Sequence, residues 1–141
     1  MLPLPFKHSL PIKKKLALVA HDTQKDSMIA WCQKHLKQLK KHQLFATGTT
    51  GSLLEQKCGL KVKKFVSGPL GGDQQIGASI VEKKVNMLVF FWDPLEPMPH
   101  DPDIKALLRV ATMWNIPIAC NKTTADFLIK SPLMGKSYQL W

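Results

Sequence analysis

The stretch SGPLGGDQQIGA, residues 67–78, follows an apolar segment at 62–66 and leads into a helical pattern of apolar residues. Glycine loses more conformational freedom on folding than other residues, so the adjacent Gly71 and Gly72 indicate a tight bend or a close approach of the backbone to another group. Two interpretations are open at this point. The loop is a strand-to-helix turn in which Asp73 caps the helix, or it brings Asp73 into a functional site.

The same order, an apolar strand followed by a helix, repeats along the chain. Five apolar segments bounded by glycine, proline and polar residues predict strands at 16–20, 44–46, 62–66, 87–92 and 116–120. Three stripes at helical spacing predict helices, the first from Met28, Cys32, His35, Leu36 and Leu39, the second from Ile76, Ile80 and Val81, and the third from Ile104, Leu107, Leu108 and Ala111. The strand segments lack clean alternation, which is typical of strands buried on both faces. We therefore predict an α/β fold, a single Rossmann-like three-layer domain with a mainly parallel five-stranded sheet, over residues 15–141, after an N-terminal lead-in at 1–14.

The composition is that of a globular domain. The chain has 141 residues, of which 45% are hydrophobic and 21% charged, and its longest apolar run is 87–92. That run is far shorter than the ~20 residues of a membrane span. The first lysines follow the apolar residues, the reverse of a secretory signal. Cys32, Cys58 and Cys120 form neither a CxxC pair nor a metal-ligand spacing. We expect a cytoplasmic protein with reduced thiols, no membrane association and no bound metal.

The formal net charge of +10 suggests an anionic partner. The lysines gather at a strand entrance, on a helix face and near helix ends, where solvated charge is common. No aromatic residues interleave with them as a base-stacking platform requires. We interpret the charge as a general attraction for anions, including small phosphorylated metabolites, and keep nucleic acid as a minor alternative.

Polar residues follow all five predicted strands. They are His21 and Asp22 after the first strand, 47–51 after the second, 67–75 after the third, 93–103 after the fourth and 121–124 after the fifth. Ligands of such folds bind at the carboxyl ends of the strands. The sequence therefore predicts a functional site at this edge of the sheet. For His21 and Asp22 the alternatives of a packed histidine and a helix cap stay open.

The segment TGTTG, residues 47–51, places three hydroxyls and two glycines at a helix start. Backbone N–H groups, hydroxyl donors and the helix dipole favour a bound phosphate, and Ser67, Gly68 and Lys25 could add donors and charge. The spacing is not that of a P-loop. Threonine also caps helices without any ligand, so both interpretations stay open.

The segment WDPLEPMPHDPD, residues 92–103, is rich in acids and in prolines that stiffen the loop. Asp101 or Asp103 could cap the helix that begins near Ile104. Capping does not explain the adjacent His100. A histidine held by a carboxylate can donate to a carbonyl oxygen or shuttle a proton, whereas the alternative is an ordinary surface histidine.

Taken together, these segments resemble methylglyoxal synthase. The resemblance is carried by LALVAHD, FATGTTG, SGPLGGDQQIGA, FFWDPL, PHDPDIKALLR and WNIPIACNKTTADFLI, in the order and spacing of that family and from about Lys15 to Ser131. It implies an enzyme that converts dihydroxyacetone phosphate to methylglyoxal and inorganic phosphate. It also implies that the enzyme uses no metal or organic cofactor and is a cytoplasmic homohexamer.

The resemblance also implies roles for individual residues. Asp73 matches the catalytic base, and His100 matches the donor to the substrate carbonyl oxygen. Asp22, Asp93 and Asp103 match active-site carboxylates that orient the site and shuttle protons. The positions that match substrate and phosphate binding are His21, Lys25, Thr47, Gly48, Thr49, Thr50, Ser67 and Gly68.

In one respect this sequence departs from the family pattern. Similar proteins continue beyond Ser131 and Pro132 into a longer tail with a basic residue that reaches the phosphate, whereas this sequence ends LMGKSYQLW. We therefore expect residues 136–141 to contribute only modestly to substrate binding.

The alternative to an enzyme is a non-catalytic regulatory domain of the same fold that binds a phosphorylated effector, which would not need Asp73, His100 and Asp103 together.

Overall fold

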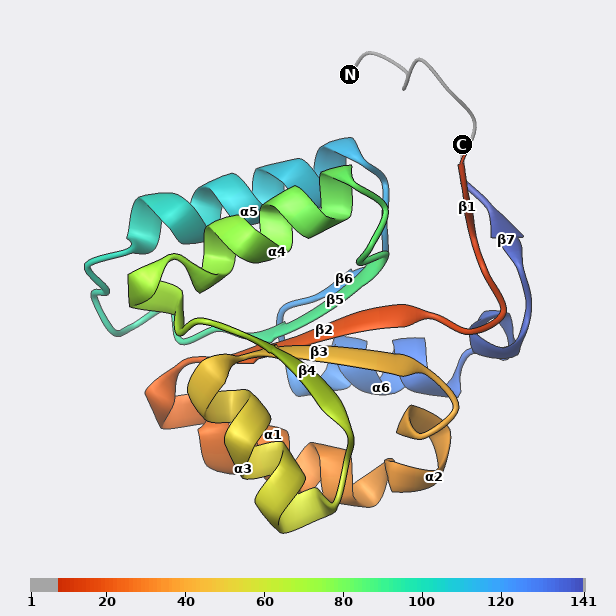
Figure 1. The fold of residues 1–141 in the computed structure, drawn as a ribbon, viewed down its shortest axis with the longest axis horizontal. Helices are drawn as coiled ribbons and strands as arrows, with labels where there is room; N and C mark the ends of the chain where they lie inside the picture. The colour runs from red at the N-terminus through yellow and green to blue at the C-terminus, as the bar shows by residue number, and fades with distance from the viewer. Residues whose placement is uncertain (1–7, 141) are drawn as a thin grey trace.

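The computed structural model describes residues 8–140, which fold around a five-stranded sheet (Figure 1). The strands are β2 (Lys15–Ala20), β3 (Gln43–Thr47), β4 (Val62–Phe65), β5 (Met87–Phe91) and β6 (Ile118–Ala119). Their order across the sheet is β4-β3-β2-β5-β6, and every neighbouring pair is parallel. The predicted α/β fold is confirmed, and the strand bounds differ from the predicted ones by a residue or two at most ends.

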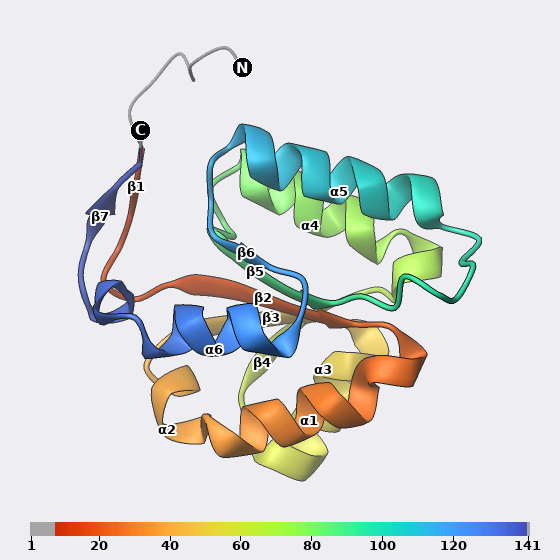
Figure 2. The same cartoon turned by 180° about the vertical axis from the view of Figure 1, so that it is seen from behind.

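Helices cover both faces of this sheet, as Figures 1 and 2 show. On one face lie α4 (Gly72–Val81) and α5 (Asp101–Met113), and on the other lie α1 (Lys25–Lys34), α2 (Leu36–Leu39), α3 (Gly48–Cys58) and α6 (Lys122–Lys130). Each face has its own cluster of buried apolar side chains. Successive residues of a strand point to opposite faces, so both sets are buried. This double burial explains why the strand segments show no polar alternation.

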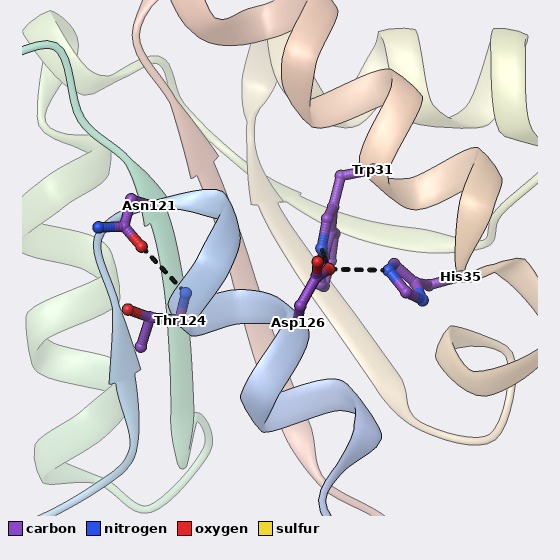
Figure 3. A network of polar contacts seen from close by, with 5 residues as sticks. All are labelled: Trp31, His35, Asn121, Thr124 and Asp126. Atoms are coloured by element: carbon purple, nitrogen blue, oxygen red, sulfur yellow. Dashed lines mark hydrogen bonds and ion pairs between the residues drawn. The ribbon is translucent and has the colours of Figure 1, made fainter.

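The first helical stripe of the sequence is divided between two helices. A single stripe over 28–39 predicts one helix, but α1 ends at Lys34 and α2 begins at Leu36, with a break at His35. The buried His35 side chain turns toward α6, where its Nε2 lies 3.1 Å from Oδ1 of Asp126 (Figure 3). Trp31 Nε1 donates to the same oxygen at 2.9 Å. These contacts join α1 to α6 beneath the sheet.

Helix α6 was not among the predicted helices, although its start carries a clear signal. The side chain of Asn121 accepts a hydrogen bond from the backbone N–H of Thr124 at 3.0 Å, an N-cap (Figure 3). Ala125 and Ile129 then face the core at helical spacing. One residue of the second predicted helical stripe does not face the core, because Val81, at the end of α4, is exposed.

A small second sheet joins the two ends of the described chain. Strand β1 (Ser9–Leu10) pairs antiparallel with β7 (Tyr138–Gln139), after the 3₁₀ turn η3 (Pro132–Gly135). The nearby Lys14 is buried, and its Nζ donates to the carbonyl oxygens of Pro11, Ile12 and Lys136. Within the predicted lead-in, Leu10 and Lys14 are therefore buried, whereas residues 1–7 lie outside the described part. No helix within 8–140 has the length and apolar character needed to span a bilayer.

Candidate active site

The predicted residues meet in one cavity of about 400 Å³ at the carboxyl edge of the sheet. Ten of them line it: His21, Asp22, Lys25, Thr47, Thr49, Thr50, Ser67, Gly68, Asp73 and His100. They follow β2, β3, β4 and β5, whose carboxyl ends lie at the left of the sheet in Figure 1. The interpretation of these loops as parts of one site agrees with this arrangement, because parallel strands bring their carboxyl ends to one edge.

The paired glycines place Asp73 inside this cavity. Gly71 has φ +110°, a conformation that other residues rarely adopt. At Gly72 a Cβ atom would lie 2.1 Å from the carbonyl oxygen of Val66, so only glycine permits this approach. Helix α4 then begins at Gly72, and Asp73 lies in its first turn rather than at the N-cap, where no side-chain cap is formed. The capping interpretation of Asp73 is therefore wrong.

Asp73 is a buried carboxylate without a hydrogen-bond partner. Its side chain is 1% exposed, and Oδ2 accepts no hydrogen bond from the described residues. Burial raises the pKa of Asp73 above its ordinary value, the nearby His100 opposes that shift, and the charge of Asp103 reinforces it. A carboxylate with a raised pKa accepts a proton more readily than an exposed one.

His100 faces Asp73 across the cavity. Its Nε2 lies 3.7 Å from Oδ2 of Asp73, and its buried Nδ1 has no partner among the described residues. Gly68 permits this juxtaposition, because a Cβ there would lie 3.0 Å from Nε2 of His100 and 3.5 Å from Oδ1 of Asp73. His100 occupies the N-cap position of α5, and neither Asp101 nor Asp103 caps that helix. The interpretation of His100 as an exposed surface histidine is wrong.

His21 supplies a second imidazole to the cavity. Its Nδ1 accepts a hydrogen bond from the backbone N–H of Asp93 at 3.0 Å, and its ring packs edge-on against Phe90 and His100. Burial is the main cause that lowers the pKa of His21, and His100 adds to it, although Asp93, Asp101 and Asp22 oppose the shift. The neutral ring therefore carries its proton on Nε2, which is buried and has no partner among the described residues.

The hydroxyl-rich side of the cavity surrounds the N-terminus of α3. Thr47 precedes this 11-residue helix without capping it through its side chain, and Thr50 has a buried Oγ1 with no partner in the described chain. Gly48 does not line the cavity, but a Cβ there would lie 3.2 Å from the carbonyl oxygen of Phe65. Free backbone donors, hydroxyls and the helix dipole together favour a bound dianion.

The other predicted carboxylates are more exposed than Asp73. The largely exposed Asp22 is ion-paired with Lys25, and this contact is the main cause that lowers the pKa of Asp22. Asp93 and Asp103 do not line the cavity. Asp93 accepts a hydrogen bond from Thr23, and Asp103 lies in the first turn of α5 near Asp73.

The structure adds lining residues that the sequence did not single out. The apolar wall of the cavity is formed by the end of β2 together with Pro69, Phe90, Met98 and Pro99. Pro69 belongs to the segment 67–69, which the sequence indicated as a source of donors, and Pro99 belongs to the segment 92–103, whose prolines were expected to stiffen the loop. Within residues 8–140, no cluster of His, Cys, Asp or Glu side chains has the arrangement of a metal site.

Comparison with known proteins agrees with this geometry. Residues 27–120 match the family model of the MGS-like domain. The chain is 63% identical to a methylglyoxal synthase of Cellvibrio japonicus over 130 residues, which are 92% of this chain and 84% of the relative. It is 64% identical to one of Hahella chejuensis over 84% of this chain and 77% of that protein. The crystal structure of a methylglyoxal synthase from Elizabethkingia anophelis superposes with a TM-score of 0.91 at 50% identity, covering 96% of this chain and 90% of that one.

Proposed function

We propose that this chain, which belongs to the methylglyoxal synthase family, converts dihydroxyacetone phosphate to methylglyoxal and inorganic phosphate. The observation that carries the proposal is the pair formed by Asp73 and His100. A buried carboxylate without a hydrogen-bond partner and a buried imidazole face the same cavity, 3.7 Å apart. This is the arrangement that proton abstraction beside a carbonyl group requires.

Asp73 acts first, as the base. It takes a proton from the substrate carbon that bears the hydroxyl group, and the electron pair of that C–H bond forms a carbon–carbon double bond to the carbonyl carbon. The carbonyl oxygen gains the negative charge of an enediolate. His100, and Nε2–H of His21, donate hydrogen bonds to the oxygens on which this charge develops.

Phosphate then leaves from the other carbon. The remaining hydroxyl oxygen of the enediolate gives up its proton and forms a carbonyl, the double bond moves to the adjacent carbon, and the carbon–oxygen bond to phosphate breaks with its electron pair. The resulting enolate takes a proton on its terminal carbon and becomes methylglyoxal. Atoms balance without an oxidant, a metal or a cofactor.

The phosphate group is held on the hydroxyl-rich side of the cavity. The N-terminus of α3 supplies backbone donors, with Thr47, Thr49, Thr50 and Ser67 around it, and Lys25 adds a positive charge to the cavity lining. These groups stabilise the charge of the departing phosphate. Asp22 holds Lys25 in place, and Asp103 helps to keep the pKa of Asp73 raised, while both can pass protons to solvent.

Three further parts of the proposal come from the family resemblance. We propose a homohexamer, a cytoplasmic location, and no role for metal ions. Light scattering coupled to size-exclusion chromatography tests the oligomeric state.

Activity should survive exhaustive treatment with a chelator. Loss of activity, restored by one divalent ion, would contradict the cofactor-free mechanism.

The central experiment mixes the purified protein with dihydroxyacetone phosphate and measures methylglyoxal and inorganic phosphate separately. We expect the two products in equal amounts. Asp73→Asn should abolish nearly all of this activity, whereas Asp126→Asn, the same substitution in a cluster outside the cavity, should retain it. Tight binding of phosphorylated compounds without product would instead identify a non-catalytic regulatory domain.

A further inference from the structure

Thr23 lies outside the cavity, and its side chain is hydrogen-bonded to the loop that follows β5. It belongs to η1 (Asp22–Gln24), two residues after His21, and its side chain donates through Oγ1 to Oδ2 of Asp93. The other carboxylate oxygen, Oδ1, accepts the backbone N–H of Leu95 at 3.0 Å. Both oxygens of Asp93 are therefore engaged, and its rotamer is fixed.

The fixed Asp93 in turn holds the His21 ring. Its backbone N–H donates to Nδ1 of His21 at 3.0 Å, while the backbone N–H of His21 donates to the carbonyl oxygen of Phe91 at 3.2 Å. Strands β2 and β5 pair as far as Ala20 and Phe91. With the bond from Thr23, three hydrogen bonds thus continue the link between these two chain segments beyond the last strand pair.

This link determines which nitrogen of His21 faces the cavity with a proton. A backbone N–H can only donate, so Nδ1 must accept and the neutral ring must be protonated on Nε2. Nε2 is buried, and it has no partner among the described residues. Without the bond that anchors the Asp93 side chain, the backbone at Asp93 could shift, its N–H could turn away from Nδ1, and the other tautomer would become accessible.

We infer that Thr23 is a positioning residue, which fixes the tautomer and orientation of His21 by holding Asp93. The inference rests on the proposed function for its catalytic consequence, because a donor at Nε2 matters only if an oxygen of the substrate lies opposite. The role requires a hydroxyl rather than mere bulk at position 23, since the bond to Asp93 needs a donor. The charged groups that affect the pKa of His21 are His100, Asp93, Asp101 and Asp22. Thr23 carries no charge, and it acts on His21 only through its hydrogen bond to Asp93.

Nuclear magnetic resonance of protein with nitrogen-15-labelled histidine tests this inference without an activity assay. The tautomer of His21, assigned by the loss of its signals in His21→Gln, should be the Nε2–H form in the wild type at neutral pH. Thr23→Val preserves shape but removes the donor, and it should give a mixture of the two tautomers. Thr23→Ser restores a hydroxyl and should restore the single form.

The activity of these variants is the second measurement. We expect kcat/KM to fall roughly twofold to tenfold in Thr23→Val, the effect of losing one hydrogen bond, with kcat affected more than KM and Thr23→Ser close to wild type. Thr112→Val is the matched control, because Thr112 is an exposed threonine whose hydroxyl bonds only within α5. It should change neither the tautomer nor the rate.

Three results would overturn the inference. They are a wild-type tautomer in Thr23→Val, a mixed tautomer that persists in Thr23→Ser, and a mixture that also forms in Thr112→Val. A failure of the proposed function would look different. The wild-type protein would then release no methylglyoxal, while the tautomer would still respond to position 23 as described.

Discussion

Two polar clusters of this molecule, one buried in the cavity and one half-buried between α1 and α6, contain similar residues but differ in their hydrogen bonding. Between α1 and α6, Oδ1 of Asp126 accepts from both Trp31 and His35 (Figure 3). In the cavity, Asp73 and His100 lie 3.7 Å apart. Buried atoms of both residues, and of His21 and Thr50, have no partner in the described chain. Folded proteins pair nearly all buried polar atoms, and we propose that a substrate supplies the missing partners of the cavity cluster.

The two aspartates show the same contrast in their pKa values. Burial raises the pKa of Asp73, whereas the hydrogen bond from Trp31 is the main cause that lowers the pKa of Asp126. The burial of an ionised Asp73 therefore reduces stability, as expected for the base that we propose, while the Asp126 cluster stabilises the packing of two helices. The difference teaches that the residue type alone does not distinguish the two roles.

The largest expected effect is on catalysis by Asp73→Asn. Because the amide cannot accept the proton, we expect kcat to fall by about 10²–10⁴, with no loss of melting temperature, since a buried charge has been removed. Calorimetry and steady-state assays measure the two quantities. Asp126→Asn retains an acceptor oxygen and should keep its rate, so an equal loss of rate in both variants would break the comparison.

The two buried histidines allow the next test. His100→Gln should lower kcat by about 10²–10³, because the amide is a weaker donor and cannot shuttle a proton. His35→Gln should leave kcat per folded molecule unchanged and lower the melting temperature instead, because His35 contacts Asp126 and not the cavity. If His100→Gln changes only the melting temperature, His100 has a structural role.

The Asp126 cluster should respond to truncation in stability alone. Asp126→Ala leaves the N–H groups of the buried Trp31 and His35 without their acceptor. We expect a loss of about 1–2 kcal/mol in the free energy of unfolding, at the low end for buried donors because the Asp126 side chain is 34% exposed and water can reach it. Urea unfolding measures this loss. A variant with wild-type stability and reduced kcat would reverse the roles assigned to the two clusters.

The smallest expected effect is the pH dependence of stability, which has opposite signs for the two aspartates. The raised pKa of Asp73 gives stability that is present below the unfolded-state pKa of about 4 and is lost as the pH rises through the folded-state value. The lowered pKa of Asp126 gives stability that is present above the unfolded-state pKa and is lost as the pH falls through the folded-state value. Unfolding of wild type, Asp73→Asn and Asp126→Asn across this acid range measures both. Slopes of the same sign would contradict the contrast.

Sequence reasoning succeeded where a short segment determines its own structure. Apolar runs beside glycines predicted the parallel sheet, and the parallel sheet placed His21, Thr47, Ser67 and His100 at one edge. The segments repeat a strand–loop–helix order whose geometry allows few alternatives. The capping interpretation of Asp73 failed because Gly71 and Gly72 already form the turn, so the N-cap is Gly71, two residues before Asp73.

Contacts between distant segments could not be predicted in this way. The bond between His35 and Asp126 joins residues 91 apart, and the bond between Thr23 and Asp93 joins residues 70 apart. Both depend on side-chain directions that arise only after the helices pack. The stripe over 28–39 correctly placed His35 toward the interior but gave no sign that the helix would break there.

The pairing of β1 with β7 has a practical consequence for protein engineering. The backbone N–H of Leu140 donates to the carbonyl oxygen of His8 at 3.0 Å, so the two ends of the described chain lie side by side (Figure 1). A short linker from 140 to 8 would close the backbone into a ring, and new termini could be opened at the exposed turn of Gly59. Such a circular permutant would keep the strand order of the sheet. A tag or a surface tether attached near the β1–β7 pair would hold the molecule by the end opposite the cavity and leave its entrance free.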